Sequence, residues 1–301
     1  MAETSKIEWC DSTFNAWIGC TKIAPACDFC YAADMAKRYG WVEWGNHPRK
    51  RTSAALWAGP KKWQRQAADF FAEHGRKRRV FCSSLADVFD NQVPPEWRAD
   101  LWDLIRATPD LNWLLLTKRP QNIEGMLPAF WDDVKGHVWL GTTVENQKYA
   151  DQNIPHLLKH DSAVRFISAE PLLGPIDLSS IDVTGYEEVL PLGAAWLGRL
   201  EDGEEEHQRR IDWVIAGGES GPHARPSEVK WFRGLRDQCV AAGVPFLFKQ
   251  WGEWRGVEIG NAESWPDAQR FEWPSGAVNV RKGKKVAGRH LDGALHDGFP
   301  G

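Results

Sequence analysis

Trp113-Leu-Leu-Leu-Thr-Lys-Arg-Pro120 is an apolar run that changes abruptly to charged residues, and the same design recurs along the chain. A short apolar run that ends in turn residues is typical of a strand buried on both faces of a sheet. Comparable strands are expected at residues 79–83, 138–142, 164–168, 212–216 and 245–248. Segments with helical spacing lie between most of them, at residues 94–107, 121–131, 148–159 and 228–242. Buried strands that alternate with helices predict a parallel sheet with right-handed crossovers.

Each of these strands ends in hydroxyl or ionisable side chains. They are Ser83 with Ser84 and Asp87, Lys118, Thr143 with Glu145, Ser168 with Glu170, Glu219 with Ser220, and Lys249. Polar residues at many strand ends are typical of the C-terminal face of a (β/α) barrel, whereas an open doubly wound sheet gathers its chemistry at one switch point. The sequence therefore predicts an α/β protein with a complete or partial (β/α) barrel of the TIM type, and the open sheet is the alternative.

Two regions fall outside the repeating pattern. Residues 179–210 contain the acidic run Glu201-Asp-Gly-Glu-Glu-Glu206, and we interpret them as a surface insertion. Residues 253–301 are rich in glycine, tryptophan and basic residues and are interpreted as a C-terminal cap. The expected organisation is thus a barrel over residues 1–252, followed by this cap.

Composition limits the class of protein. The chain has 301 residues, of which 43% are hydrophobic and 26% charged, with a net charge of −4. It contains no apolar run near the roughly 20 residues of a membrane span, and its first residues lack the apolar core of a signal peptide. We therefore expect a cytoplasmic protein with reduced thiols and no membrane contact. The net charge gives no general attraction to nucleic acid, although residues 76–79 and 281–285 are locally basic.

The cysteine-rich stretch is Trp17-Ile-Gly-Cys20-Thr-Lys-Ile-Ala-Pro-Ala-Cys27-Asp-Phe-Cys30-Tyr31. Its spacing, Cys-x6-Cys-x2-Cys, allows one loop to wrap three thiolates around one metal centre. Thiolates are the preferred ligands of iron–sulfur clusters, and three of them leave one iron of a [4Fe–4S] cluster open to a small molecule. We therefore interpret Cys20, Cys27 and Cys30 as cluster ligands, on a loop that precedes a helix at residues 31–39.

Two alternatives to the cluster remain. A structural zinc ion usually takes four protein ligands, so zinc would have to recruit Cys10 or His47. The thiols could also bind nothing. Disulfides are disfavoured, because the chain shows no secretory start and three closely spaced cysteines cannot all pair.

Cys27-Asp-Phe29-Cys30 resembles the end of the cluster motif of radical S-adenosylmethionine (radical SAM) enzymes. In that motif the residue before the last cysteine is usually aromatic and packs beside the adenine of the cofactor. The usual spacing is Cys-x3-Cys-x2-Cys, so the first interval of this chain departs from it.

A wider set of motifs resembles the phage gene-product 37/68 family over nearly the whole chain. The motifs are Ile7-Glu-Trp9, the cysteine-rich stretch, Leu116-Thr-Lys-Arg-Pro120, Gly141-Thr-Thr-Val-Glu-Asn-Gln147, Ser168-Ala-Glu-Pro-Leu172, Trp213-Val-Ile-Ala-Gly-Gly-Glu-Ser-Gly221, Phe248-Lys-Gln-Trp-Gly252 and Leu291-Asp-Gly293. That family is similar to radical SAM proteins, and its reaction is largely unassigned.

The resemblance implies a role for each candidate residue. Cys20, Cys27 and Cys30 would hold the cluster, and Phe29 would lie beside the adenine. Gly217-Gly218-Glu219 resembles the element that holds the methionyl amine, but it follows a late strand instead of an early one. By strand order, the methionyl group is better matched by Ser83, Ser84 and Asp87, and the ribose hydroxyls by Thr143, Glu145 and Asn146. Four residues would then face substrate, unless they form a ring of salt bridges: Lys118, Glu170, Glu219 and Lys249.

The implied function is a radical SAM enzyme that uses its cluster to cleave S-adenosylmethionine and form a 5′-deoxyadenosyl radical. Its expected substrate is a hypermodified base in phage DNA, such as an amino-acid-substituted thymidine, which it would modify or isomerise in the bacterial cytoplasm. An electron donor such as flavodoxin or ferredoxin would be its partner. The alternative is a non-catalytic iron–sulfur or zinc protein that binds nucleic acid or takes part in a phage–host interaction.

Overall fold

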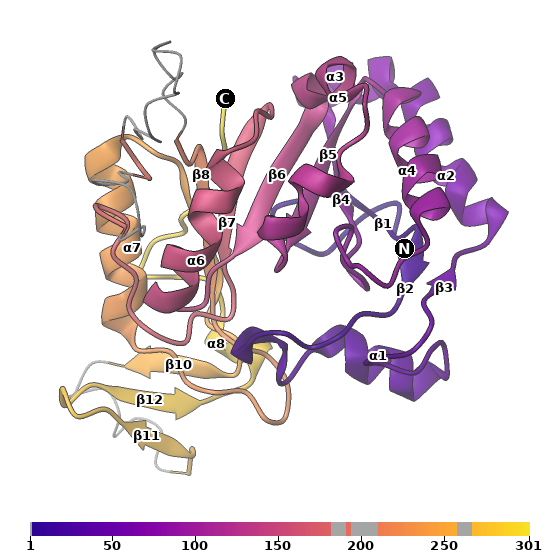
Figure 1. The fold of residues 1–301 in the computed structure, drawn as a ribbon. Helices are drawn as coiled ribbons and strands as arrows, with labels where there is room; N and C mark the ends of the chain where they lie inside the picture. The colour runs from indigo at the N-terminus through magenta and orange to yellow at the C-terminus, as the bar shows by residue number, and fades with distance from the viewer. Residues whose placement is uncertain (1, 182–190, 194–209, 258–266) are drawn as a thin grey trace. The chain divides into compact units, whose positions relative to one another are not determined.

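A computed structural model describes residues 2–181, 191–193, 210–257 and 267–301 (Figure 1). Most of the expected surface insertion at 179–210, including its acidic run, lies outside the described residues. The chain divides into two compact units, one formed by Met1–Thr142 with His160–Arg165, and the other by Thr143–Lys159 with Phe166–Gly301. The expected boundary after residue 252 is a different division and stays a prediction.

The main sheet has seven strands in the order β1-β4-β5-β6-β7-β8-β9. Their bounds are Ser12–Phe14, Arg78–Cys82, Leu111–Thr117, Val138–Thr143, Val164–Ala169, Trp213–Gly217 and Phe246–Gln250. Neighbouring strands within each unit are parallel. The strand order follows the chain order and lacks the reversal that creates the switch point of a doubly wound sheet. The fold is therefore α/β with a partial (β/α) barrel, as the sequence predicts.

The first unit contains β1, β4, β5 and most of β6. Their side chains are apolar and fully buried on both faces, as at Phe14, Val80, Trp113 and Leu115, because helices cover a parallel sheet. The short strands β2 and β3 pair antiparallel beside the sheet, at Trp17–Ile18 and Lys50–Arg51. The helices are α1, α2, α3 and α4, at Tyr31–Tyr39, Ala54–Arg65, Ala67–His74 and Pro95–Arg106.

The helix α1 begins and ends where the sequence predicts. Gly40 caps it in the left-handed conformation, with φ of 62°, a backbone region that suits glycine. The helix expected at residues 121–131, by contrast, is wrong. That segment forms two 3-10 turns, η2 and η3, and is followed by the short helix α5 and the turn η4, at Pro120–Asn122, Glu124–Met126, Trp131–Val134 and Lys135–His137. Pro128 explains the break, because proline forces the residue before it, Leu127, into extended backbone.

The second unit contains β7, β8 and β9 with helices α6 and α7, at Gln147–Leu158 and Val229–Ala242. A three-stranded antiparallel sheet in the order β10-β12-β11 and the short helix α8 follow, at Trp254–Val257, Val278–Arg281, Arg270–Glu272 and Lys284–Ala287. The end of the chain packs on the main sheet, since the Phe248 amide donates to the His296 carbonyl at 2.9 Å and the Trp213 indole to the Gly298 carbonyl at 2.8 Å. Among the helices that the structure describes, none has the length and apolarity that crossing a bilayer requires.

Candidate functional site

The cysteine loop runs from the end of β2 to the start of α1. Pro25 opens a 3-10 turn that ends at Cys27, and Cys30 is the N-cap residue of α1. Cys27 is buried, whereas Cys20 and Cys30 are half-buried. Proline has no amide hydrogen, but at the first position of a turn that hydrogen would have no acceptor within the turn. Pro25 therefore favours this local conformation.

Both ends of the loop are tied to the turn that follows β4. At one end, the Gly19 amide donates to the Leu85 carbonyl at 3.1 Å. At the other, the Tyr31 hydroxyl donates to the Ser84 carbonyl at 2.7 Å. Asn15 reinforces this turn, since its amide nitrogen donates to Ser84 Oγ and its amide oxygen accepts from the Leu85 amide. The loop therefore lies at the carboxyl end of β4.

Asp87, a candidate for the methionyl-binding place, is buried and accepts four hydrogen bonds from the protein. Its Oδ1 accepts from the Thr117 hydroxyl at 2.7 Å and from the Phe89 amide at 2.9 Å. Its Oδ2 accepts from the Lys118 amide and from Arg119 Nη1, both at 3.1 Å. The carboxylate thus joins the end of β5 to the turn after β4, and a role toward a cofactor stays a prediction.

Arg119 connects this buried carboxylate to the cysteine loop. Its Nη1 atom donates to Cys20 Sγ at 3.5 Å, and its Nη2 atom donates to the Thr21 carbonyl at 2.9 Å. Burial raises the pKa of the Cys20 thiol to about 11, with a further increase from the charge of Asp87, while Arg119 opposes the shift. A positive charge beside this sulfur stabilises its thiolate form, which is the form that binds metal.

The cysteine loop suits an iron–sulfur cluster by the chemistry of its donors. Cys20, Cys27 and Cys30 carry free thiols, and thiolates are the ligands that such clusters prefer. Within the described ranges, no three Cys, His, Asp or Glu side chains are gathered so that they could hold a metal ion. The positions of these side chains therefore do not by themselves indicate a zinc site or a cluster site. Ligation by the three cysteines stays a prediction.

In the second unit, Glu170 and Lys249 form an ion pair at the ends of β7 and β9. Lys249 Nζ lies 2.9 Å from Glu170 Oε1, and the two side chains are 19% and 13% exposed. The Ser168 hydroxyl donates to Glu170 Oε2 at 3.4 Å. A Cβ atom on Gly217 would lie only 2.6 Å from Glu170 Oε1, so glycine at the end of β8 leaves room for the carboxylate.

Glu219 follows the end of β8 and forms an ion pair with Arg225. The Arg225 side chain donates to both carboxylate oxygens, at 2.6 and 2.9 Å, and its amide adds a bond at 2.8 Å. Gly218 is close to the backbone after β9, since its Cβ would lie 1.9 Å from the Trp251 carbonyl oxygen. Packing therefore accounts for glycine at 218, and a role of residues 217–219 toward a methionyl amine stays a prediction.

The three ribose candidates have different surroundings. Asn146 is the N-cap of α6, where its side chain accepts from the Tyr149 amide at 3.3 Å, which explains the residue by capping alone. Glu145 is buried, with 1% of its surface exposed. Thr143 is equally buried, and its hydroxyl oxygen has no hydrogen-bond partner among the described residues. A buried hydroxyl without a partner is costly, so Thr143 is the ribose candidate that a ligand would best satisfy.

Sequence reasoning missed Arg119 and Arg225. Both stand in quoted motifs or close to them, but the sequence does not tell which of two adjacent cations turns inward at Lys118-Arg119. The backbone of Arg119, with φ of −126° and ψ of 53°, leads into the 3-10 turn η2 that begins at Pro120. The arginine is buried and Lys118 only half-buried, so the inward position follows from the turn.

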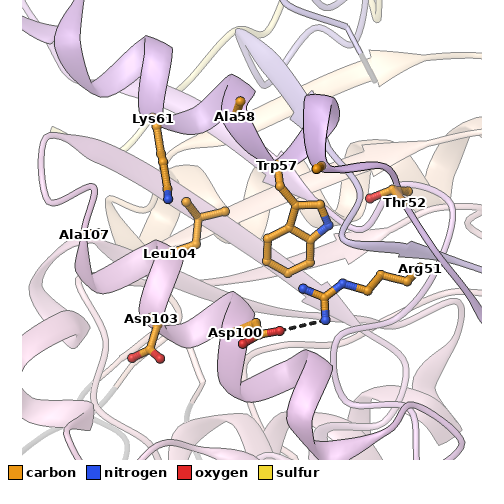
Figure 2. A pocket seen from close by; sticks show the side chains of 10 residues that line it. Arg51, Thr52, Trp57, Ala58, Lys61, Asp100, Asp103, Leu104 and Ala107 are labelled. Atoms are coloured by element: carbon orange, nitrogen blue, oxygen red, sulfur yellow. Dashed lines mark ion pairs between the residues drawn. The ribbon is translucent and has the colours of Figure 1, made fainter.

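A cavity of about 530 Å³ lies elsewhere in the first unit, between α2 and α4 (Figure 2). Arg51 forms an ion pair with Asp100 at 2.7 Å, and its guanidinium lies 4.5 Å from the centre of the Trp57 ring. None of the residues predicted for the site lines this cavity, and Lys61 and Asp103 add one charge of each sign. The mixed charges give no preference for an anion or a cation.

Three solved structures of spore photoproduct lyase are similar to this chain. The lyase complexed with dinucleoside spore photoproduct has 11% sequence identity and a TM-score of 0.41, with 95% of this chain and 72% of that chain covered. A double mutant with bound AdoMet and the dinucleoside has 11% identity and a TM-score of 0.40, with 93% and 71% covered. A single mutant has 12% identity and a TM-score of 0.40, with 95% and 72% covered. Such a likeness concerns the general course of the chain and not its chemistry.

The family comparison covers almost the whole sequence, although no curated protein matches it. One family model matches residues 4–300, and its description is "Protein of unknown function (DUF5131)". By this match from end to end, the chain belongs to the DUF5131 family.

Proposed function

We propose that this chain is a radical SAM enzyme that holds a [4Fe–4S] cluster through Cys20, Cys27 and Cys30. The observation that carries the proposal is the contact of Arg119 with Cys20, on a loop whose three cysteines carry free thiols. A neutral thiol is a weak acceptor, whereas a thiolate makes a strong charge-assisted hydrogen bond with a guanidinium, so this contact favours a Cys20 that acts as a thiolate ligand. The membership of the phage gene-product 37/68 family, which the motifs resemble, is part of this proposal.

When bound, a cluster of this type supplies the electron for reductive cleavage of S-adenosylmethionine, which yields the 5′-deoxyadenosyl radical that abstracts hydrogen from the substrate. The residues of the chain would bind and orient the reactants. The Phe29 ring, 38% exposed beside Cys30, would pack against the adenine. Ser83 and Ser84 would offer hydroxyl groups to the methionyl part, next to the turn to which the loop is tied.

In the second unit, the ion pair of Glu170 and Lys249 would receive the substrate. Lys249 would bind a carboxylate or phosphate of the substrate, and Glu170 would hold an amine or move a proton. Each partner now neutralises the other, so a zwitterionic substrate would replace one ion pair by two. The resemblance also assigns Lys118 and Glu219 to the substrate, and each would offer one further charged group. The Thr143 hydroxyl would bind the ribose.

The substrate that we propose is a hypermodified base in phage DNA, such as an amino-acid-substituted thymidine. Such a base carries both an amine and a carboxylate, which match Glu170 and Lys249 in charge. The basic segment 281–285 would contribute to DNA binding. The basic segment 76–79 is less suited to this role, because Arg76 and Arg79 pair with Asp11 at the amino end of β4. The electron would come from a donor such as flavodoxin or ferredoxin.

The test is turnover of S-adenosylmethionine by reconstituted protein under reducing conditions, with modified or unmodified phage DNA. We expect Glu170→Gln and Lys249→Met to lower DNA-dependent product formation by about 100-fold or more, the usual scale for a lost acid–base or positioning group. Lys61→Met is the matched control, because Lys61 is exposed in α2 and has no part in the predicted site or in DNA binding, and it should be neutral. Equal activity of all three variants, or no product with either DNA, would contradict the proposed substrate site.

A second candidate function is a non-catalytic metalloprotein that binds nucleic acid or takes part in a phage–host interaction. The ion pairs Glu170–Lys249 and Glu219–Arg225 favour it, because satisfied pairs at the strand ends need no substrate to explain them. Under this candidate, the Glu170 and Lys249 variants would bind DNA as the natural protein does and would show no loss of function in cells.

A further inference from the structure

Arg119 is 6% exposed, and the described hydrogen bonds of its side chain go to three groups. They are the Asp87 carboxylate, the Thr21 carbonyl and the Cys20 sulfur. Burying a charged group is costly unless it is paired, and Asp87 supplies the opposite charge. Two of the three groups nevertheless belong to the cysteine loop and not to the sheet.

Within the described residues, two other buried arginines of the first unit donate only to oxygen atoms, although Arg49 also reaches the cysteine loop through the Thr21 hydroxyl at 2.8 Å. Arg98 donates to the Val88 and Asp90 carbonyls at 2.9 and 2.8 Å. Arg49 pairs with the Asp90 carboxylate at 2.6 Å. These bonds go to oxygen atoms, which are strong acceptors. Arg119 differs in directing one donor at a cysteine sulfur that the proposed function makes a metal ligand.

Asp87 keeps the guanidinium of Arg119 in this orientation. The carboxylate is fixed by the Thr117 hydroxyl and by backbone amides, so it cannot follow the arginine if the loop moves. The plane of the guanidinium is therefore set by the sheet, and the loop is held against it. Such an arrangement holds the Cys20 end of the loop in a fixed position relative to β4 and β5.

We propose that Arg119 is the positioning residue of the iron–sulfur site, fixing Cys20 against the sheet and raising the reduction potential of the cluster. The inference rests on the proposed function, since it assigns a role toward the cluster. Hydrogen bonds to ligand sulfurs and nearby positive charge stabilise the reduced cluster, which carries more negative charge. Cys27 and Cys30 have no described bond to an arginine, so the effect is directed at one ligand.

The test compares Arg119→Gln and Arg119→Lys with the natural chain, with Arg98→Gln as the control for loss of a buried guanidinium. Without cluster, amide hydrogen exchange at residues 19–23 should become faster in Arg119→Gln and stay unchanged in Arg98→Gln. With cluster, redox titration followed by electron paramagnetic resonance should show a lower midpoint potential in Arg119→Gln. We expect the ratio of reduced to oxidised cluster at a fixed potential to fall roughly tenfold, or about 59 mV for one electron.

A double variant, called the paired variant here, controls for destabilisation by an unpaired buried charge. Arg119→Gln alone leaves Asp87 buried without its counter-charge, so Asp87→Asn with Arg119→Gln keeps the pocket neutral and should show the same changes. Arg119→Lys keeps the positive charge but loses the several donors of the planar guanidinium. The midpoint potential of its cluster should therefore fall less than in Arg119→Gln. Unchanged exchange and unchanged potential in the paired variant would overturn the inference while leaving the enzyme proposal intact. A natural chain that takes up no cluster would instead overturn the proposed function.

Discussion

Asp87→Ala is expected to lower the free energy of unfolding by about 3–5 kcal/mol, the cost of removing one partner from a buried ion pair. The carboxylate accepts four hydrogen bonds, and its loss leaves the guanidinium of Arg119 buried without a counter-charge. The Thr117 hydroxyl also loses its described acceptor. The measurement is urea unfolding followed by tryptophan fluorescence.

Asp100→Ala is the matched control for this measurement. Asp100 also pairs with an arginine, Arg51, at 2.7 Å, but its side chain is 52% exposed. Exposed pairs contribute about 0–1 kcal/mol, so the control should unfold close to the natural protein. Similar unfolding midpoints for the two variants would show that the Asp87 network does not stabilise the first unit as the structure implies.

Replacing Cys20, Cys27 or Cys30 by alanine is expected to abolish cluster uptake. Under the proposed function each cysteine would supply one of three thiolates, and two would not retain a cluster whose fourth iron has no protein ligand. Iron and acid-labile sulfide after anaerobic reconstitution should therefore fall to background in each variant. The fold should survive in Cys20→Ala and Cys30→Ala, because these two side chains are only half-buried, and the buried Cys27 loses only a small thiol.

Cys82→Ala and Cys239→Ala are the controls for the cysteine variants. Both thiols are fully buried, and burial raises the pKa of each to about 12, so they act as small apolar groups. These variants should bind iron as the natural chain does. Equal iron binding in Cys27→Ala would mean that the metal sits elsewhere, and tightly bound zinc in the natural chain would favour the second candidate function.

The periodicity of the sequence predicted most of the elements. The apolar runs correspond to β4 through β9, and Gly40 marks the end of α1, because these features depend on residues close together in the chain. The helix expected at 121–131 is absent for an equally local reason, since Pro128 holds Leu127 in extended backbone. Helical spacing alone does not outweigh a proline in the segment.

The candidate site was predictable only in part. The sequence placed ionisable residues at strand ends, but it did not show that Glu170 would pair with Lys249, or Glu219 with Arg225. Such pairs depend on how the loops after the strands turn. The sequence likewise does not distinguish Arg119 from Lys118. Only the folded turn shows that Arg119 faces the cysteine loop.

The most direct test of the account is low-temperature electron paramagnetic resonance of the reconstituted, reduced protein, with and without S-adenosylmethionine. We expect a [4Fe–4S] signal that changes when the cofactor is added, because the cofactor would bind the iron that the three cysteines leave open. Cys27→Ala should show neither the signal nor the change. A protein that takes up no cluster, or a signal that S-adenosylmethionine does not alter, would contradict the central claim.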